Sequence, residues 1–137
     1  MKIKDNLRDV RNRIKSAKDR KSINQAVQVV AVTKTHPLAV IRECYKAGIG
    51  SIGENRVQEA SEKFQNFSGF SGITKRFIGH LQTNKVKKCL DLFDTIDSVD
   101  SIKLARKISN LAESLGKIIP VLLEVNTTKE KQKHGFL

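Results

Sequence analysis

Apolar residues near the start of the chain recur at alternating spacings of four and three. This spacing places them in one stripe along a helix, so it predicts an amphipathic α-helix over residues 1–22. The stripe consists of Ile3, Leu7, Val10, Ile14 and Ala17. The positions between them are mostly charged. The opposite face of this helix is therefore expected to lie in water.

From residue 28 onward, short apolar runs alternate with longer segments of mixed polarity. The apolar runs predict buried strands at residues 28–33, 50–53, 76–79, 93–97 and 119–125. The segments between them predict helices at residues 38–47, 57–67, 84–92 and 101–115. Such alternation is typical of βαβ units and a parallel sheet. The predicted fold is α/β: a partial TIM-type (β/α) barrel of about five parallel strands with flanking helices, preceded by the N-terminal helix.

Polar residues stand at or just after the end of each predicted strand. In βα barrels, functional groups gather at the carboxyl ends of the strands, on the loops that follow them. We therefore expect these side chains to share a pocket, although the ordinary solvation of loops would produce part of the same pattern. The residues are Lys34, Glu54, Asn55, His80, Gln82, Asp97, Ser98 and Asn126.

Lys34 is the candidate for chemistry. Period-two alternation puts it on the same face of the first strand as Val30 and Val32, with Thr33 on the other face. An ammonium group that continues an apolar face is partly desolvated, which favours the neutral amine. A neutral amine attacks aldehydes to form a Schiff base. The alternative is a lysine that extends into solvent and takes no part in chemistry.

The charge of the chain adds a second hypothesis. The formal net charge is +12, and residues 2–21 contribute nine basic and three acidic residues to it. A basic balance favours anionic partners, which include nucleic acids and phosphorylated ligands. No aromatic residues lie between these bases, as a base-stacking surface would require. A solvated helix face is the favoured interpretation, and nucleic-acid binding is the alternative.

The sequence gives little indication of a reactive cysteine, a metal site or a membrane segment. Cys44 and Cys89 stand singly, which is typical of reduced, packed thiols in a cytoplasmic protein. His36, His80 and His134 lack ligand spacing, so no metal site is expected. The chain contains neither an apolar run long enough for a membrane span nor a signal-peptide pattern. We therefore expect a cytoplasmic protein without a membrane partner.

Several short motifs stand in order along the chain. The first strand leads into VAVTK with Lys34, and the second into GENRVQE; FIGHLQTNKVK, IDSVDSIKLA and PVLLEVNTTKEKQKHGF follow. These motifs resemble the pyridoxal phosphate homeostasis proteins (the YggS/PROSC type), whose patterns are V-A-V-S/T-K and G-E-N-x-V-Q-E. Lys75 and Arg76 depart from the family, which often has Trp-His there. More distantly, the fold and the lysine resemble the barrel domain of alanine racemases.

The resemblance implies that Lys34 holds pyridoxal 5′-phosphate (PLP) as a Schiff base. It also places Asn55 beside the pyridoxal ring, with Ile78 and Ser98 close to the same pocket. The implied function is PLP binding in intracellular vitamin B6 homeostasis without substrate turnover, with apo PLP enzymes as recipients. A racemase-like or transaminase-like enzyme is one alternative. A basic module that binds nucleic acid or a protein partner is the other.

Five strands are too few to close an eight-stranded barrel. By the resemblance, residues 1–137 form a single incomplete PLP-binding domain, with the helix at residues 1–22 and the βα units at residues 28–137. The family's phosphate-binding segments would follow Leu137. The favoured interpretation is that the chain is a fragment of a longer protein. The alternatives are one of two pairing half-barrels and a shortened protein that has drifted from cofactor binding. In each case, open strand edges predict self-association.

Overall fold

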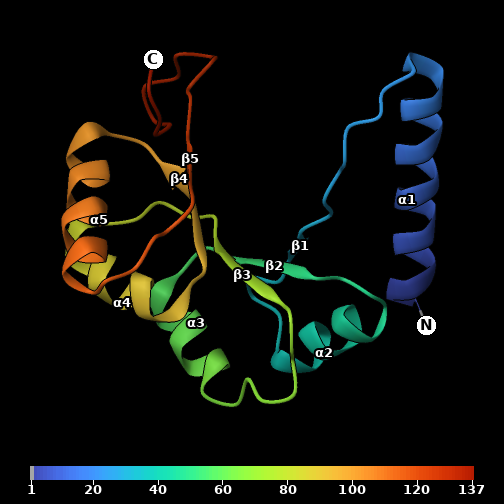
Figure 1. Ribbon diagram of the computed structural model, residues 1–137, viewed down its shortest axis with the longest axis horizontal. Helices are drawn as coiled ribbons and strands as arrows, with labels where there is room; N and C mark the ends of the chain where they lie inside the picture. Colours follow the sequence, from blue (N-terminus) through green and yellow to red (C-terminus); the bar gives the residue numbers. More distant parts are fainter. Residues whose placement is uncertain (1) are drawn as a thin grey trace.

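The protein is a curved, five-stranded parallel sheet with helices along one side (Figure 1). The computed structural model describes residues 2–137. The strands lie in the sheet in the order in which they occur in the chain. They are β1 (Ala31–Val32), β2 (Ser51–Glu54), β3 (Thr74–Phe77), β4 (Thr95–Val99) and β5 (Val121–Leu123). This arrangement confirms the predicted partial βα barrel.

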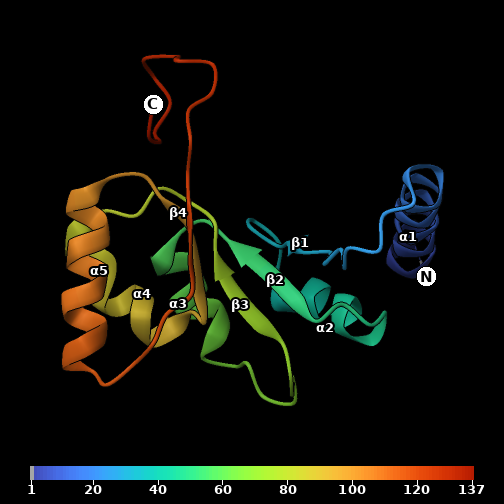
Figure 2. The same ribbon diagram turned by 45° about the horizontal axis from the view of Figure 1, so that its top comes forward.

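Helices connect successive strands and run along one side of the sheet (Figure 2). Gly48 and Gly116 follow two of the helices with φ angles of 86° and 62°, a left-handed conformation that glycine adopts without steric cost. Ser101 begins the last helix, where its Oγ accepts a hydrogen bond from the Leu104 N–H. The helices are α1 (Lys2–Lys21), α2 (Leu38–Lys46), α3 (Val57–Phe64), the 3₁₀ helix η1 (Thr83–Lys85), α4 (Val86–Leu92) and α5 (Ile102–Ser114).

The main core lies between the sheet and helices α3, α4 and α5. Phe77 of β3 and Ile96 of β4 are each 1% exposed and pack into it. Ile52 of β2 belongs to a neighbouring cluster with Ile41 of α2. Burying one such side chain stabilises the fold by about 1.5–3 kcal/mol. The helix-facing side of the sheet therefore carries most of the packing.

The N-terminal helix α1 stands apart from the sheet and is joined to it by an extended segment (Figure 1). Leu7 is its only buried residue among those described, and it packs with Cys44 and Ile49. A guanidinium nitrogen of Arg11 donates to the Gly48 carbonyl oxygen at 2.9 Å. Val10 is exposed. The predicted apolar stripe thus contacts the rest of the protein mainly through its first half.

Several element boundaries differ from the predicted ones. β1 covers two residues, because it pairs only with β2 and its register begins at Ala31 opposite Ile52. The predicted third strand lies two residues too late. The predicted fourth strand lies two residues too early, because Phe93 ends α4 and packs in the core instead of opening β4. β4 also contains a bulge: the four residues from Ile96 to Val99 lie opposite the three from Val121 to Leu123 on β5.

Both cysteines are free and buried, which confirms the prediction of packed thiols. Burial raises the pKa of Cys89 to about 12. It also raises the pKa of Cys44, with a smaller contribution from the neighbouring Glu43 carboxylate. Thiolates are the reactive form, so both side chains are chemically inert near neutral pH. None of the helices in residues 2–137 is long and apolar enough to cross a membrane.

Candidate functional site

Lys34 lies in the turn that follows β1, and the alternation of the strand puts it on the side of the sheet that faces away from the helices. Thr33, its neighbour, is buried on the helix side, and Val32 is 50% exposed on the opposite side, which confirms the predicted alternation. The expected desolvation of Lys34 is wrong, because its side chain is exposed. No strand or helix of the described residues covers this inner face of the sheet. The amine is therefore accessible from solvent.

Asn55, Ile78 and Ser98 come together around the ends of β2, β3 and β4. The Ser98 hydroxyl donates to the Gly79 carbonyl oxygen. A Cβ on Gly79 would lie 2.2 Å from the Asn55 carbonyl oxygen, so only glycine permits this approach. A Cβ on Gly53 would lie 2.9 Å from Cδ1 of Ile78. The Asn55 Oδ1 atom is buried and has no hydrogen-bond partner among residues 2–137.

Lys34 neighbours this group through the backbone. The Thr33 N–H donates to the Gly53 carbonyl oxygen at 2.9 Å, and the Ile78 N–H donates to the Glu54 carbonyl oxygen at 2.9 Å. These bonds align the ends of β1, β2 and β3. The four predicted cofactor residues therefore stand at adjacent strand ends, as a barrel mouth requires. Their binding roles remain predictions.

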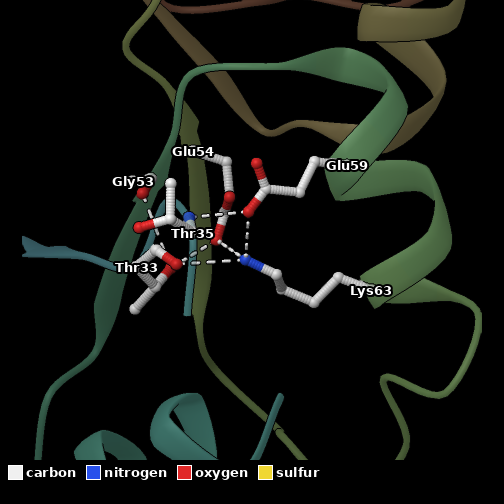
Figure 3. Close-up of polar contacts among 6 residues, drawn as sticks. All are labelled: Thr33, Thr35, Gly53, Glu54, Glu59 and Lys63. Atoms are coloured by element: carbon white, nitrogen blue, oxygen red, sulfur yellow. Dashed lines mark hydrogen bonds and ion pairs between the residues drawn. The ribbon is translucent and has the colours of Figure 1, made fainter. Parts of the chain in front are cut away.

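Glu54 does not face the mouth, contrary to its predicted place in a shared pocket. It is fully buried on the helix side of β2, because it pairs in register with the core residue Phe77. Its Oε1 accepts bonds from the Thr33 hydroxyl at 2.6 Å and from Lys63 Nζ at 2.7 Å (Figure 3). Lys63 is not among the residues that the strand-end pattern predicts for the site. The spacing Glu59–Lys63 on one helix was the only signal that could have identified it.

Arg76 and Asp97 form an ion pair on the inner face of the sheet. Arg76 Nε lies 2.6 Å from Asp97 Oδ2, and a second guanidinium nitrogen lies 3.2 Å from Oδ1. Thr95 donates a further bond to Asp97 at 2.9 Å. The prediction that Asp97 follows its strand is wrong, because β4 extends to Val99. Asp97 is therefore engaged within the sheet, on the opposite side from Glu54.

Two histidines that lack ligand spacing in the sequence meet in the fold. The rings of His80 and His134 stack with centroids 3.7 Å apart. Asp100 Oδ2 lies 2.9 Å from His80 Nδ1 and 3.9 Å from His134 Nδ1. Neither Gln82 nor Asn126 hydrogen-bonds to these three side chains within residues 2–137. Gln82 is exposed, and Asn126 is buried with its Nδ2 donating to the Glu130 carbonyl oxygen.

Comparison with known proteins shows which family the chain resembles. Residues 2–137 match the family described as "Alanine racemase, N-terminal domain". A curated relative from Synechocystis sp., named "Pyridoxal phosphate homeostasis protein", is 39% identical over 111 residues, which are 81% of this chain and 51% of the relative. The chain spans about half the length of the curated relatives it matches.

Solved structures agree with the sequence matches. PipY of Synechococcus elongatus, solved with PLP bound, superposes with a TM-score of 0.76 at 39% identity, over 88% of this chain and 56% of PipY. An alanine racemase from Clostridium difficile superposes with a TM-score of 0.65 at 21% identity, over 86% of this chain and 31% of the racemase, and shows the fold alone. The sequence match, the parallel strand order and these superpositions agree, and the chain belongs to the alanine racemase N-terminal domain family.

Proposed function

We propose that this chain binds PLP through Lys34 and serves PLP homeostasis. The observation that carries the proposal is the exposed Lys34 amine at the end of β1, beside the strand ends that present Asn55, Ile78 and Ser98. PLP supplies an aldehyde that condenses with a primary amine with loss of water. The relative named for PLP homeostasis and the PLP-bound PipY structure support the choice of ligand.

The residues around Lys34 fit the ring end of the cofactor. The alternation of β2 puts Asn55 on the inner face with Gly53, where the buried Oδ1 atom has no partner among the described residues. An unpaired buried acceptor costs about 1–3 kcal/mol, so a hydroxyl donor there is favoured. The ring hydroxyl of PLP is such a donor. Ile78 would add an apolar contact, and the Ser98 hydroxyl fixes the neighbouring loop by bonding Gly79.

The test is covalent mapping. PLP is added to the chain, the mixture is reduced with borohydride, and the labelled lysines are identified by peptide mapping. The expected result is label concentrated on Lys34 and lost in Lys34→Ala. Lys103→Ala is the matched control, because Lys103 is an exposed lysine on α5. Label spread evenly over surface lysines, or an unchanged pattern in Lys34→Ala, would contradict the proposal.

The proposal includes the absence of substrate turnover. A racemase-type reaction needs a second acid–base group opposite the lysine. Tyr45, the one tyrosine of the chain, lies on α2 and packs against Phe70 with ring centroids 5.6 Å apart, in the cluster on the helix side. It therefore does not approach Lys34. Incubation of the PLP-loaded chain with L-alanine should give no D-alanine or pyruvate above the protein-free rate. Steady turnover that is lost in Lys34→Ala would favour the enzyme.

Two further parts of the proposal concern partners. We infer that apo PLP enzymes in the cytoplasm receive the cofactor, which a transfer assay from loaded chain to an apo enzyme checks. We also infer that a chain of these residues self-associates, because β5 leaves an edge where Leu122 and Leu123 are 55% and 63% exposed. Sedimentation should show oligomers, fewer with Leu122→Lys. A monomer at all concentrations would contradict this inference.

A further inference from the structure

Lys63 lies at the centre of a buried polar cluster on the helix side of the sheet. Its Nζ donates to three oxygens: Glu54 Oε1 at 2.7 Å, the Thr33 carbonyl oxygen at 3.0 Å and Glu59 Oε1 at 3.2 Å (Figure 3). An ammonium group has three protons, so these bonds satisfy it completely. The side chain of Lys63 is 7% exposed and that of Glu54 is fully buried.

The cluster holds the backbone on both sides of Lys34. Before it, Thr33 is bound twice, through its carbonyl oxygen to Lys63 and through its hydroxyl to Glu54. After it, the Thr35 N–H donates to Glu59 Oε1 at 2.7 Å. Thr35 has a φ of 63°, a left-handed conformation that is sterically strained for a β-branched residue. The Glu59 carboxylate therefore stabilises a turn that the chain would otherwise leave.

Nothing in the cluster touches the Lys34 amine itself. No hydrogen bond or ion pair within the described part of the chain joins the Lys34 ammonium to another residue. An effect of the cluster on Lys34 must act through the position of its backbone. A fixed strand end limits the directions in which the amine can extend, which lowers the entropy lost when it reacts.

Stability alone explains this cluster poorly. Taking charges out of water costs several kcal/mol per ion, and a buried ion pair is often no more stabilising than apolar residues of the same volume. Here the Lys63 ammonium and the Glu54 carboxylate are buried where apolar packing would serve the fold as well, and the Glu59 carboxylate at their edge is 27% exposed. Their bonds to the segment that follows β1 go to Thr33 and Thr35, the two neighbours of Lys34. This placement indicates a positioning role.

We propose that Lys63, Glu54 and Glu59 are positioning residues that hold the Lys34 turn in the orientation needed for selective reaction with PLP. The inference rests on the proposed function and deepens it. Lys63 is not itself an attachment site, because three oxygens occupy its protons and its side chain is buried. The selectivity for Lys34 over the other lysines then depends on α3, the helix that supplies Lys63 and Glu59.

The experiment compares variants of α3 in the full chain. Glu59→Ala removes the bond to Thr35, and Glu59→Gln keeps an amide oxygen that can accept it. Glu62→Ala is the matched control, because Glu62 is an exposed glutamate on the same helix whose bond goes to Gln58. Each variant is labelled with PLP and borohydride, and the label on Lys34 is expressed relative to all other lysines. Circular dichroism and urea unfolding establish that each variant is folded.

Glu59→Ala should lower the share of label on Lys34 roughly tenfold, while Glu59→Gln retains most of it and Glu62→Ala is unchanged. A folded Lys63→Met chain should show a still smaller share of label on Lys34. If Lys63→Met does not fold, the result for Glu59→Ala decides the question. A folded Glu59→Ala chain that labels Lys34 like the wild type would overturn the positioning role and leave PLP binding intact. A wild-type chain without label on Lys34 would overturn the proposed function and this inference with it.

Discussion

The two faces of the sheet differ in how deeply their side chains are buried and in what those side chains contact. The helix side carries Ile52, Phe77 and Ile96, all 0–1% exposed and packed under α2 to α5. The inner side carries Val32, half exposed, the Arg76–Asp97 pair and the candidate site. Because side chains alternate along each strand, one residue packs in the core and the next faces the candidate site. The helix side, which carries the core, also holds the residues that bond to Thr33 and Thr35 on either side of Lys34.

Glu54 connects the two sides. It lies among core residues, but its bonds go to Thr33 and Lys63, next to the site-bearing turn. A change on the helix side should therefore alter both stability and the site. A change on the inner side should alter the site with little effect on stability. This separation can be tested residue by residue.

The largest effect is expected for Phe77→Ala, which empties a position that is 1% exposed. Loss of a buried phenyl ring should destabilise the fold by about 3–5 kcal/mol. The inner-face variant Val32→Ala should cost less than about 1 kcal/mol, because half of that side chain is already in water. Urea unfolding of both variants measures the difference. Equal costs would show that the inner face is as packed as the helix side.

Gly79→Ala should cost about 3 kcal/mol, because its Cβ would lie 2.2 Å from the Asn55 carbonyl oxygen and the backbone must move. Gly50→Ala is the control, since nothing lies within 4 Å of the Cβ that it would add. The Gly79 variant should also lower the label on Lys34, because Asn55 moves. If Gly79→Ala is as stable as Gly50→Ala, the close approach of the two loops is absent in solution.

Asp97→Asn should cost about 1–2 kcal/mol, since it leaves the half-buried Arg76 guanidinium without its charge partner. Asp5→Asn breaks a pair with Arg8 whose side chains are both largely exposed, so it should cost close to nothing. The measurement is the thermal unfolding midpoint of each variant at low and at high salt. Equal losses of stability in Asp97→Asn and Asp5→Asn, with the same salt dependence, would show that the Arg76–Asp97 pair is exposed to solvent.

The smallest effect concerns pH. Burial alone would raise the pKa of Glu59, but the Thr35 N–H and the Lys63 ammonium outweigh it, so this pKa lies below its ordinary value. A carboxylate with a lowered folded-state pKa contributes stability that is complete above the ordinary pKa of about 4.3. That contribution is lost as the pH falls through the folded-state pKa.

The measurement is the difference in urea midpoint between wild type and Glu59→Gln from pH 6 to pH 3. The wild type should be more stable at pH 6, and the difference should shrink toward zero below about pH 4. A difference that grows on acidification would reverse the sign of the Glu59 contribution.

The sequence predicted those features that depend on local pattern. Alternation assigned Val32 and Lys34 to one face and Thr33 to the other, and Ser101 marked the start of α5. The shift of β4 was not predicted, because Phe93 continues the apolar alternation of a strand although it packs beside the end of α4. The bulge in β4 leaves no mark in an alternation that is only five residues long.

The sequence did not predict features that depend on distant packing. On α3, Lys63 looks like an ordinary surface lysine paired with Glu59. Its burial depends on how α3 lies against β2, which brings Glu54 within 2.7 Å. The exposure of Lys34 likewise depends on what covers the inner face. Neither is a property of a short segment.

The hydrogen bonds around Lys34 also limit which sequences relatives of this chain can have. At position 33 the side-chain hydroxyl donates to Glu54 Oε1, so serine or threonine keeps a bond to a buried carboxylate that otherwise depends on Lys63 alone. At position 35 the backbone N–H makes the bond, so the side chain is free to vary. The left-handed turn favours glycine or asparagine there over threonine. An alignment of relatives should therefore be nearly uniform on one side of the lysine and varied on the other.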